Sequence, residues 1–175
     1  MLYAMLLLAL FLPLGLLFNH FDQQQRNFEE GERQSSLFYA DQLRQLLPRC
    51  RKEGDDKLRE VKWKELSPLL SSGFELKERK DIKQYVDGQG FYLVWKKPKP
   101  GLANSLVKHY SRSGGQGVHL IFYHIGFAEK RGSDICLQPS RHYQYPDLSK
   151  VTCAWPLPTV ISEGALILTD REPKT

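Results

Sequence analysis

Residues 84–95 read QYVDGQGFYLVW, and this stretch decides the fold. Gln84–Val86 and Phe91–Trp95 are rich in β-branched and aromatic side chains, which favour strands. The Asp87-Gly88 pair between them is a strong signal for a tight turn. We therefore expect a hairpin here, with 91–95 as a core strand of a small antiparallel sheet.

Further elements are expected on both sides of this hairpin. Ser67-Pro68 has the form of a helix start, and that short helix should end near Gly73. Leu102–Tyr110 has the spacing of a short amphipathic helix. We also expect a glycine turn at Ser113–Gly117 and a buried strand at Val118–Ile125. The segment from Gly126 to Ser149 should be loop-like, with one apolar piece at Ile135–Leu137. A final hairpin should pair Thr159–Ile161 with Ala165–Leu168 around a turn at Glu163-Gly164.

The N-terminal segment carries the strongest localisation signal. Leu2–Phe18 contains no charged side chain, and extended to Phe21 it is long enough for a helix to cross a hydrocarbon core of about 30 Å. The alternative is a cleaved signal peptide, which needs a basic residue before the apolar run and a small-residue cleavage site after it. Neither is present, so we predict an uncleaved transmembrane anchor over residues 1–21.

The helix is expected to continue beyond the anchor as an amphipathic helix over residues 22–48, where Pro48 ends it. Five apolar side chains fall on one narrow stripe at about 100° per residue. The stripe consists of Phe21, Phe28, Tyr39, Leu43 and Leu46. Its membrane-proximal part should extend beyond contact with the protein's own sheet, and we therefore predict an assembly interface.

These elements predict an α+β fold in which the N-terminal helix packs against a small antiparallel sheet. The expected order is anchor 1–21, helix 22–48, soluble domain 49–170 and polar tail 171–175.

The chain has three cysteines, and none of them lies in a C-x-x-C pair. Cys136 and Cys153 share a loop-rich stretch and would close one loop in an oxidising compartment, leaving Cys50 as the odd one out. The alternative is three reduced thiols.

No motif indicates an enzyme, a cofactor site or a metal site. Gly114-Gly115-Gln116 resembles the catalytic tripeptide of release factors only superficially, because the residues that precede it differ. His119 and His124 are an odd number apart in one expected strand, which places them on opposite faces. Opposite charges alternate in 49–60, and the net charge is only +5, so neither a phosphate patch nor nucleic-acid binding is expected. The aromatic run 91–95 is interpreted as a core strand rather than a base-stacking platform.

Three stretches carry a family resemblance. They are 85–95 (YVDGQGFYLVW), 100–106 (PGLANSL) and 157–167 (LPTVISEGALI). Together with the N-terminal plan, they resemble the PilM family of type IVb thin-pilus biogenesis proteins. A processed pilin subunit is not expected, since the chain has no basic leader and no glutamate in its apolar run.

The resemblance implies a non-enzymatic scaffold or adaptor in the bacterial inner membrane, with its domain in the periplasm. Its partners would be the lipid bilayer, other pilus or secretion-assembly proteins, and a second copy of this chain. In that compartment, Cys136 and Cys153 should be joined. Arg26 and Arg33 on the rear flank of the anchor favour the opposite orientation. The alternative function is a generic membrane-tethered binding or sensing domain.

Overall fold

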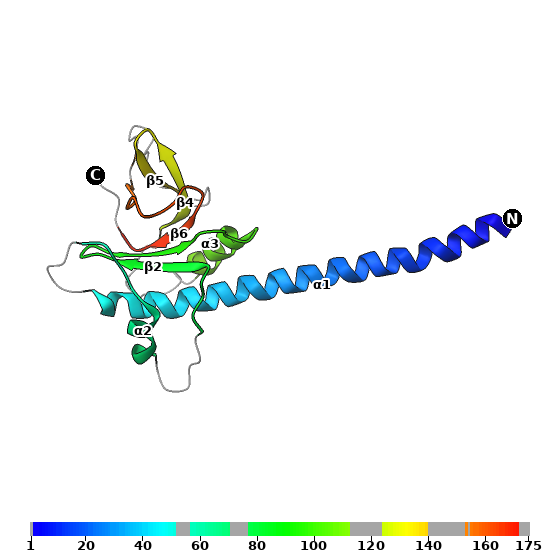
Figure 1. Cartoon of the computed structure of the whole chain (residues 1–175), viewed down its shortest axis with the longest axis horizontal. Coiled ribbons are helices and arrows are strands. Elements are labelled where there is room, and N and C mark those ends of the chain that lie inside the picture. The colour runs from blue at the N-terminus through cyan, green and yellow to red at the C-terminus, as the bar shows by residue number, and fades with distance from the viewer. Residues whose placement is uncertain are drawn as a thin grey trace. The chain divides into compact units, whose positions relative to one another are not determined.

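The computed structural model describes residues 2–51, 57–70, 77–112, 124–139, 153 and 155–171, and in 2–16, 111–112 and 139 it describes the backbone only. The chain divides into two compact units, 1–36 and 37–175. Helix α1 (Leu2–Leu46) contributes to both units, so its last turns belong to the same unit as the sheet (Figure 1).

The N-terminal segment forms one continuous helix, as predicted, and it ends close to the predicted end at Pro48. It runs through Gly31 and stops at Leu46, where the chain tightens into the 3₁₀ helix η1 (Leu47–Cys50). Pro48 lies at the start of η1, a position that needs no backbone donor. In the first unit, exposed polar side chains pair one helical turn apart, as Arg26 does with Asp22 at 2.8 Å.

Among the residues whose side chains are described, no helix is long and apolar enough to cross a membrane. The predicted anchor, 1–21, falls mainly on residues 1–16, whose side chains lie outside that description.

In its described residues, the second unit is built on a six-stranded sheet in which all paired strands are antiparallel. Its strands lie in the order β1-β2-β3-β6-β4-β5. Their bounds are β1 (Arg59–Glu60), β2 (Ile82–Val86), β3 (Phe91–Trp95), β4 (His124–Arg131), β5 (Asp134–Pro139) and β6 (Leu166–Thr169). The α+β class and the hairpin at 82–95 are therefore confirmed.

Helices cover one face of the sheet. There, alternate side chains of β2, β3 and β6 pack with the last turns of α1 and with α3 (Leu102–Arg112) in one apolar cluster (Figure 1). Its most completely buried members include Leu43, Leu93, Trp95, Leu106 and Leu168. This packing explains the helix predicted at 102–110, whose apolar side faces the sheet.

The chain between Trp155 and Ala165 covers the other face, where Tyr92, Val94 and Ile167 pack with Trp155 and Leu157. Trp155–Leu157 also pairs with β5, since the Leu137 N–H donates to the Trp155 carbonyl and the Leu157 N–H to that of Ile135. The sheet is thus sandwiched between helices and an irregular strap.

Two sequence predictions are wrong in this unit. Residues 126–139 of the expected loop form most of the β4–β5 hairpin, which turns at Gly132 with φ of 65°. The second error is the final hairpin. Residues 159–164 form turns, and β6 inserts between β3 and β4 instead of pairing with its own neighbour.

Smaller differences concern two other predictions. The helix predicted from Ser67 to about Gly73 is only a 3₁₀ turn at its start, η2 (Ser67–Leu69), after which Leu70 is extended and 71–73 lie outside the described residues. The short helix α2 (Trp63–Leu66) precedes it and was not predicted. The glycine turn at 113–117, His119 and most of the strand expected at 118–125 lie outside the described residues.

Candidate binding groove

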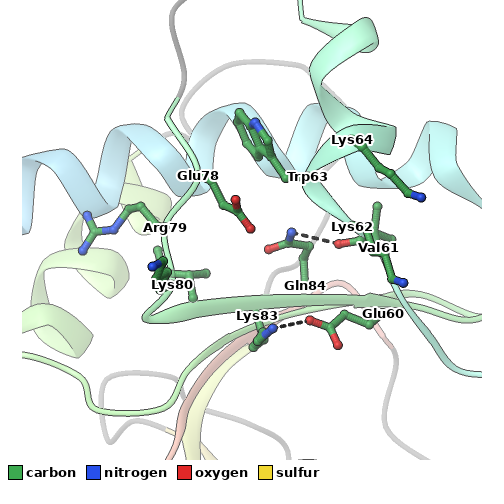
Figure 2. A pocket seen from close by; sticks show the side chains of 11 residues that line it. Glu60, Val61, Lys62, Trp63, Lys64, Glu78, Arg79, Lys80, Lys83 and Gln84 are labelled. Atoms are coloured by element: carbon green, nitrogen blue, oxygen red, sulfur yellow. Dashed lines mark hydrogen bonds and ion pairs between the residues drawn. The ribbon is translucent and has the colours of Figure 1, made fainter.

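A groove with a volume of 580 Å³ lies in the second unit, beside β1, β2 and α2 (Figure 2). Three stretches of chain line it: the run from β1 into α2, the segment before β2, and the first half of β2. The lining residues are Glu60, Val61, Lys62, Trp63, Lys64, Glu78, Arg79, Lys80, Ile82, Lys83 and Gln84.

Gln84 lies at the floor of the groove. It shares the helix-covered face of β2 with Ile82 and Val86, so an amide occupies a position where the strand otherwise has aliphatic side chains. The Gln84 side chain is only 7% exposed. Its Nε2 donates to the Val61 carbonyl at 2.9 Å, while the Val61 N–H donates to the Gln84 carbonyl at 3.0 Å.

The other end of this amide lacks a partner. Within the described part of the chain, Gln84 Oε1 is buried and accepts no hydrogen bond. Figure 2 shows the Gln84 amide oxygen on the side of the groove toward Glu78, away from Val61. A buried acceptor without a donor costs about 1–3 kcal/mol, so this atom is suited to receive an N–H or O–H group from outside the fold.

Trp63 forms a wall of the groove. Its ring is stacked with that of Tyr39 on α1, with centroids 6.4 Å apart and planes inclined by 18°. Tyr39 is buried, and that burial raises the pKa of its hydroxyl. The aromatic pair therefore fixes the start of α2 against the core.

Glu65 also fixes the start of α2. One carboxylate oxygen accepts the Lys62 N–H at 3.0 Å, and the other accepts from Arg59 at 2.7 Å. The backbone N–H of Lys62 first, and then the Arg59 guanidinium, lower the pKa of this carboxyl. Arg59 in turn donates to the Cys50 carbonyl, so the groove wall is tied to η1.

The lining is positively charged, with five basic and two acidic side chains. Lys83 pairs with Glu60, a hydrogen bond that raises the pKa of the lysine. Arg79 pairs with Asp81 just outside the lining and lowers the pKa of that carboxyl. Lys62, Lys64 and Lys80 are exposed at the rim.

Among the described residues, no group of His, Cys, Asp and Glu has the arrangement of a metal site. His109 bonds to Asp41 on α1, at 2.7 Å, and His124 is buried against Trp155. His142 lies outside the description.

Cys136 and Cys153 are joined in a disulfide, with Cα atoms 5.6 Å apart. This is the pair proposed from the sequence. Cys136 also forms a β-bridge with Pro156, so the covalent link and the backbone pairing hold the same strap against β5. Cys50 is a free thiol, and its burial raises its pKa.

The structure divides the five predicted interface residues. Phe21 and Phe28 lie in the first unit and are 65% and 67% exposed. Tyr39, Leu43 and Leu46 are buried in the core of the second unit, so they are not available to a partner. Their stripe has the predicted helical spacing, but its C-terminal half packs on the protein's own sheet.

Sequence reasoning missed the groove because its charges come from separate stretches with no shared motif. The alternating charges of 49–60 gave no sign of a strand, whereas Arg59–Glu60 is strand β1 and 52–56 lie outside the described residues. One signal was available: Gln84 is a polar residue on the same face of its strand as Ile82 and Val86, which is otherwise apolar.

Compared with known protein families, curated proteins and solved structures, the chain gives no match.

Proposed function

We propose that the protein is a non-enzymatic, membrane-anchored scaffold or adaptor of a type IVb pilus or related secretion assembly. The anchor is the apolar run Leu2–Phe18, and the domain at 37–175 acts in the periplasm. This proposal combines the sequence resemblance with the surface of α1.

The observation that carries the proposal is the aromatic side of the first unit. Phe18, Phe21 and Phe28 are each about two-thirds exposed or more, and they fall on one side of the helix. Large aromatic side chains exposed together mark contact with a membrane or a protein. At the rise of an α-helix, Phe28 lies about 15 Å beyond Phe18, so one membrane interface cannot accommodate both. Phe18 and Phe21 fit the interfacial aromatic belt, and Phe28 fits a protein partner.

The disulfide supports the periplasmic side. Structural disulfides persist in oxidising compartments and are rare in the bacterial cytosol.

Carbonate extraction and a topology reporter test the proposal. Full-length protein should stay in the carbonate-washed membrane, and a C-terminal reporter should be accessible only after the outer membrane is permeabilised. Leu7→Lys combined with Leu8→Lys should release the chain, whereas Gln24→Lys combined with Gln25→Lys should not. A chain that begins after Phe21, or a reporter active only in the cytoplasm, would refute the anchor or the orientation.

A second candidate function is a membrane-tethered binding or sensing domain. The groove favours it, because its buried, unpaired Gln84 oxygen could fix the orientation of a ligand, as the few polar groups of ligand sites do.

A further inference from the structure

We infer that the groove binds an extended, acidic peptide segment of a partner protein, with its backbone N–H groups on the floor and its carboxylates on the lysine rim. This assignment goes beyond the anchor-and-scaffold proposal and does not depend on it, since every lining residue belongs to the second unit.

The floor of the groove calls for hydrogen-bond donors. Gln84 Oε1 is buried and accepts no hydrogen bond from the described chain. The Glu78 carboxylate lies on the same side of the groove (Figure 2). Both are acceptors, so a bare anion placed against them would be repelled by Glu78. A peptide N–H supplies the donor that the buried Gln84 Oε1 lacks.

The rim, in contrast, attracts negative charge. Lys64 and Lys80 are exposed on opposite sides of the groove, one on α2 and the other in the segment before β2. Three other cations line the groove. Lys83 is paired with Glu60 and Arg79 with Asp81, while Lys62, the residue before α2, is exposed. Lys64 and Lys80 have no ion-pair partner in the part of the chain that the structure describes, so they would bind carboxylates through charge-assisted hydrogen bonds.

The edge of β2 favours an extended peptide over a small molecule. Among the described residues, strand β1 pairs only with Tyr85 and Val86, and the ladder continues through Val61 to Gln84. The chain then turns into α2. Among the described residues, Ile82 and Lys83 therefore have a strand neighbour in β3 but none on the groove side. An uncovered strand edge is a template for adding a peptide strand, in which the main chain gives affinity and side-chain pockets give specificity.

The test measures peptide binding to the full-length protein in detergent, by fluorescence anisotropy. The probe is a fluorescein-labelled octapeptide that alternates Glu and Ser. Its matched controls are a Lys/Ser octapeptide and a Glu/Ser octapeptide with a methylated backbone. We expect saturable binding of the Glu/Ser probe and none of the Lys/Ser octapeptide. The backbone-methylated Glu/Ser octapeptide should bind at least about tenfold more weakly than the probe.

Two charge-matched double variants locate the site. Lys64→Glu with Lys80→Glu should weaken binding of the acidic probe at least about tenfold, whereas Lys96→Glu with Lys97→Glu, at exposed lysines outside the groove, should change it less than about twofold. All four lysines are exposed, and circular dichroism checks that the variants fold.

Three results would overturn the inference. They are absence of saturable binding, equal weakening by both double variants, and displacement of the probe by inorganic phosphate at concentrations similar to those of the unlabelled peptide. The first two would remove the site, and the third would make it a small-anion site. None of them bears on membrane extraction, so the anchor proposal can stand or fall separately.

Discussion

Gly90 lies so close to Asp170 that a Cβ placed on the glycine would be 2.8 Å from the carboxylate oxygen Oδ1. That same oxygen accepts the Phe91 N–H at 2.7 Å, and the second carboxylate oxygen pairs with Arg51. The end of β6 is thereby attached both to the β2–β3 turn and to the chain after η1. The backbone at residue 90 can approach the Asp170 carboxylate this closely only because glycine has no side chain.

Gly90→Ala should therefore lower the free energy of unfolding. The new methyl group displaces Asp170 from its hydrogen bond or shifts Arg171, whose Cβ would be 3.1 Å away. Overpacking of this kind costs about 1–3 kcal/mol. Urea unfolding, followed by tryptophan fluorescence, measures the change.

Gly31→Ala is the matched control, because a Cβ there meets no atom within 4 Å and alanine favours a helix by about 1 kcal/mol over glycine. No loss of stability is expected from it. If Gly90→Ala unfolds at the same urea concentration as the wild type, the contact with Asp170 has no energetic role.

Removal of the Cys136–Cys153 link should destabilise the second unit. The bonded residues are 17 apart, and in the chain-entropy model closing a loop of this size contributes about 3 kcal/mol. Cys136→Ser should lower the free energy of unfolding by roughly this amount, and dithiothreitol should have the same effect on the wild type.

A non-reducing gel provides the control for this prediction. Cys50→Ser should keep a dithiothreitol-sensitive mobility shift, since Cys50 is free, and Cys136→Ser should lose it. Equal stability of oxidised and reduced wild-type protein would argue against a structural bridge.

The parts of the fold that could be predicted are those specified locally. The Asp87-Gly88 turn lies between two strands that pair with each other, and the apolar spacing of 102–110 lies on one helix. Each signal needs only neighbouring residues.

The parts that were missed depend on distant partners or on solvent. β6 pairs with β3 and β4, and no pattern within 159–169 reveals that insertion. The second half of β4, Glu129–Arg131, is exposed and charged, so it lacks the alternation typical of a half-buried strand. The groove was missed for a related reason, since Lys64 and Lys80 line the same groove only once α2 and the chain before β2 are placed.

Stability should fall in acid through Glu65. Its folded pKa lies below the ordinary value of 4.5, so the unfolded chain binds its proton first as the pH falls. The stabilisation by Glu65 is complete above about pH 4.5, and it is lost as the pH falls through the pKa of Glu65 in the folded protein. Asp81 contributes in the same way. Its hydrogen bond to Arg79 lowers its pKa from the ordinary value of 3.8, so its stabilisation is lost as the pH falls below that value.

Glu65→Gln should flatten the pH dependence of the unfolding midpoint below pH 4.5. Glu78→Gln, the same change at an exposed carboxylate, is measured beside it. Midpoints measured by thermal denaturation between pH 3 and pH 7 test this. An unchanged slope in Glu65→Gln would exclude the Glu65 carboxylate, bonded to the Lys62 N–H and to Arg59, as the source of the pH dependence.

Phe28 provides the sharpest test of the assembly interface, because it separates partner binding from folding. It belongs to the first unit, is 67% exposed and contributes nothing to either apolar cluster of the second unit. Phe28→Glu should leave thermal unfolding of the second unit unchanged. It should weaken assembly, because a charge at the centre of an apolar contact costs the burial of an aromatic side chain, about 1.5–3 kcal/mol, or roughly tenfold to a hundredfold in affinity.

Asn27→Glu introduces the same charge one position away, at an exposed residue off the aromatic side, and should bind like the wild type. Crosslinking in intact membranes and sedimentation in detergent measure complex formation with partners and with a second copy. Equal complex formation by Phe28→Glu and Asn27→Glu would mean that Phe28 faces lipid or water, and the scaffold would then act through the second unit alone.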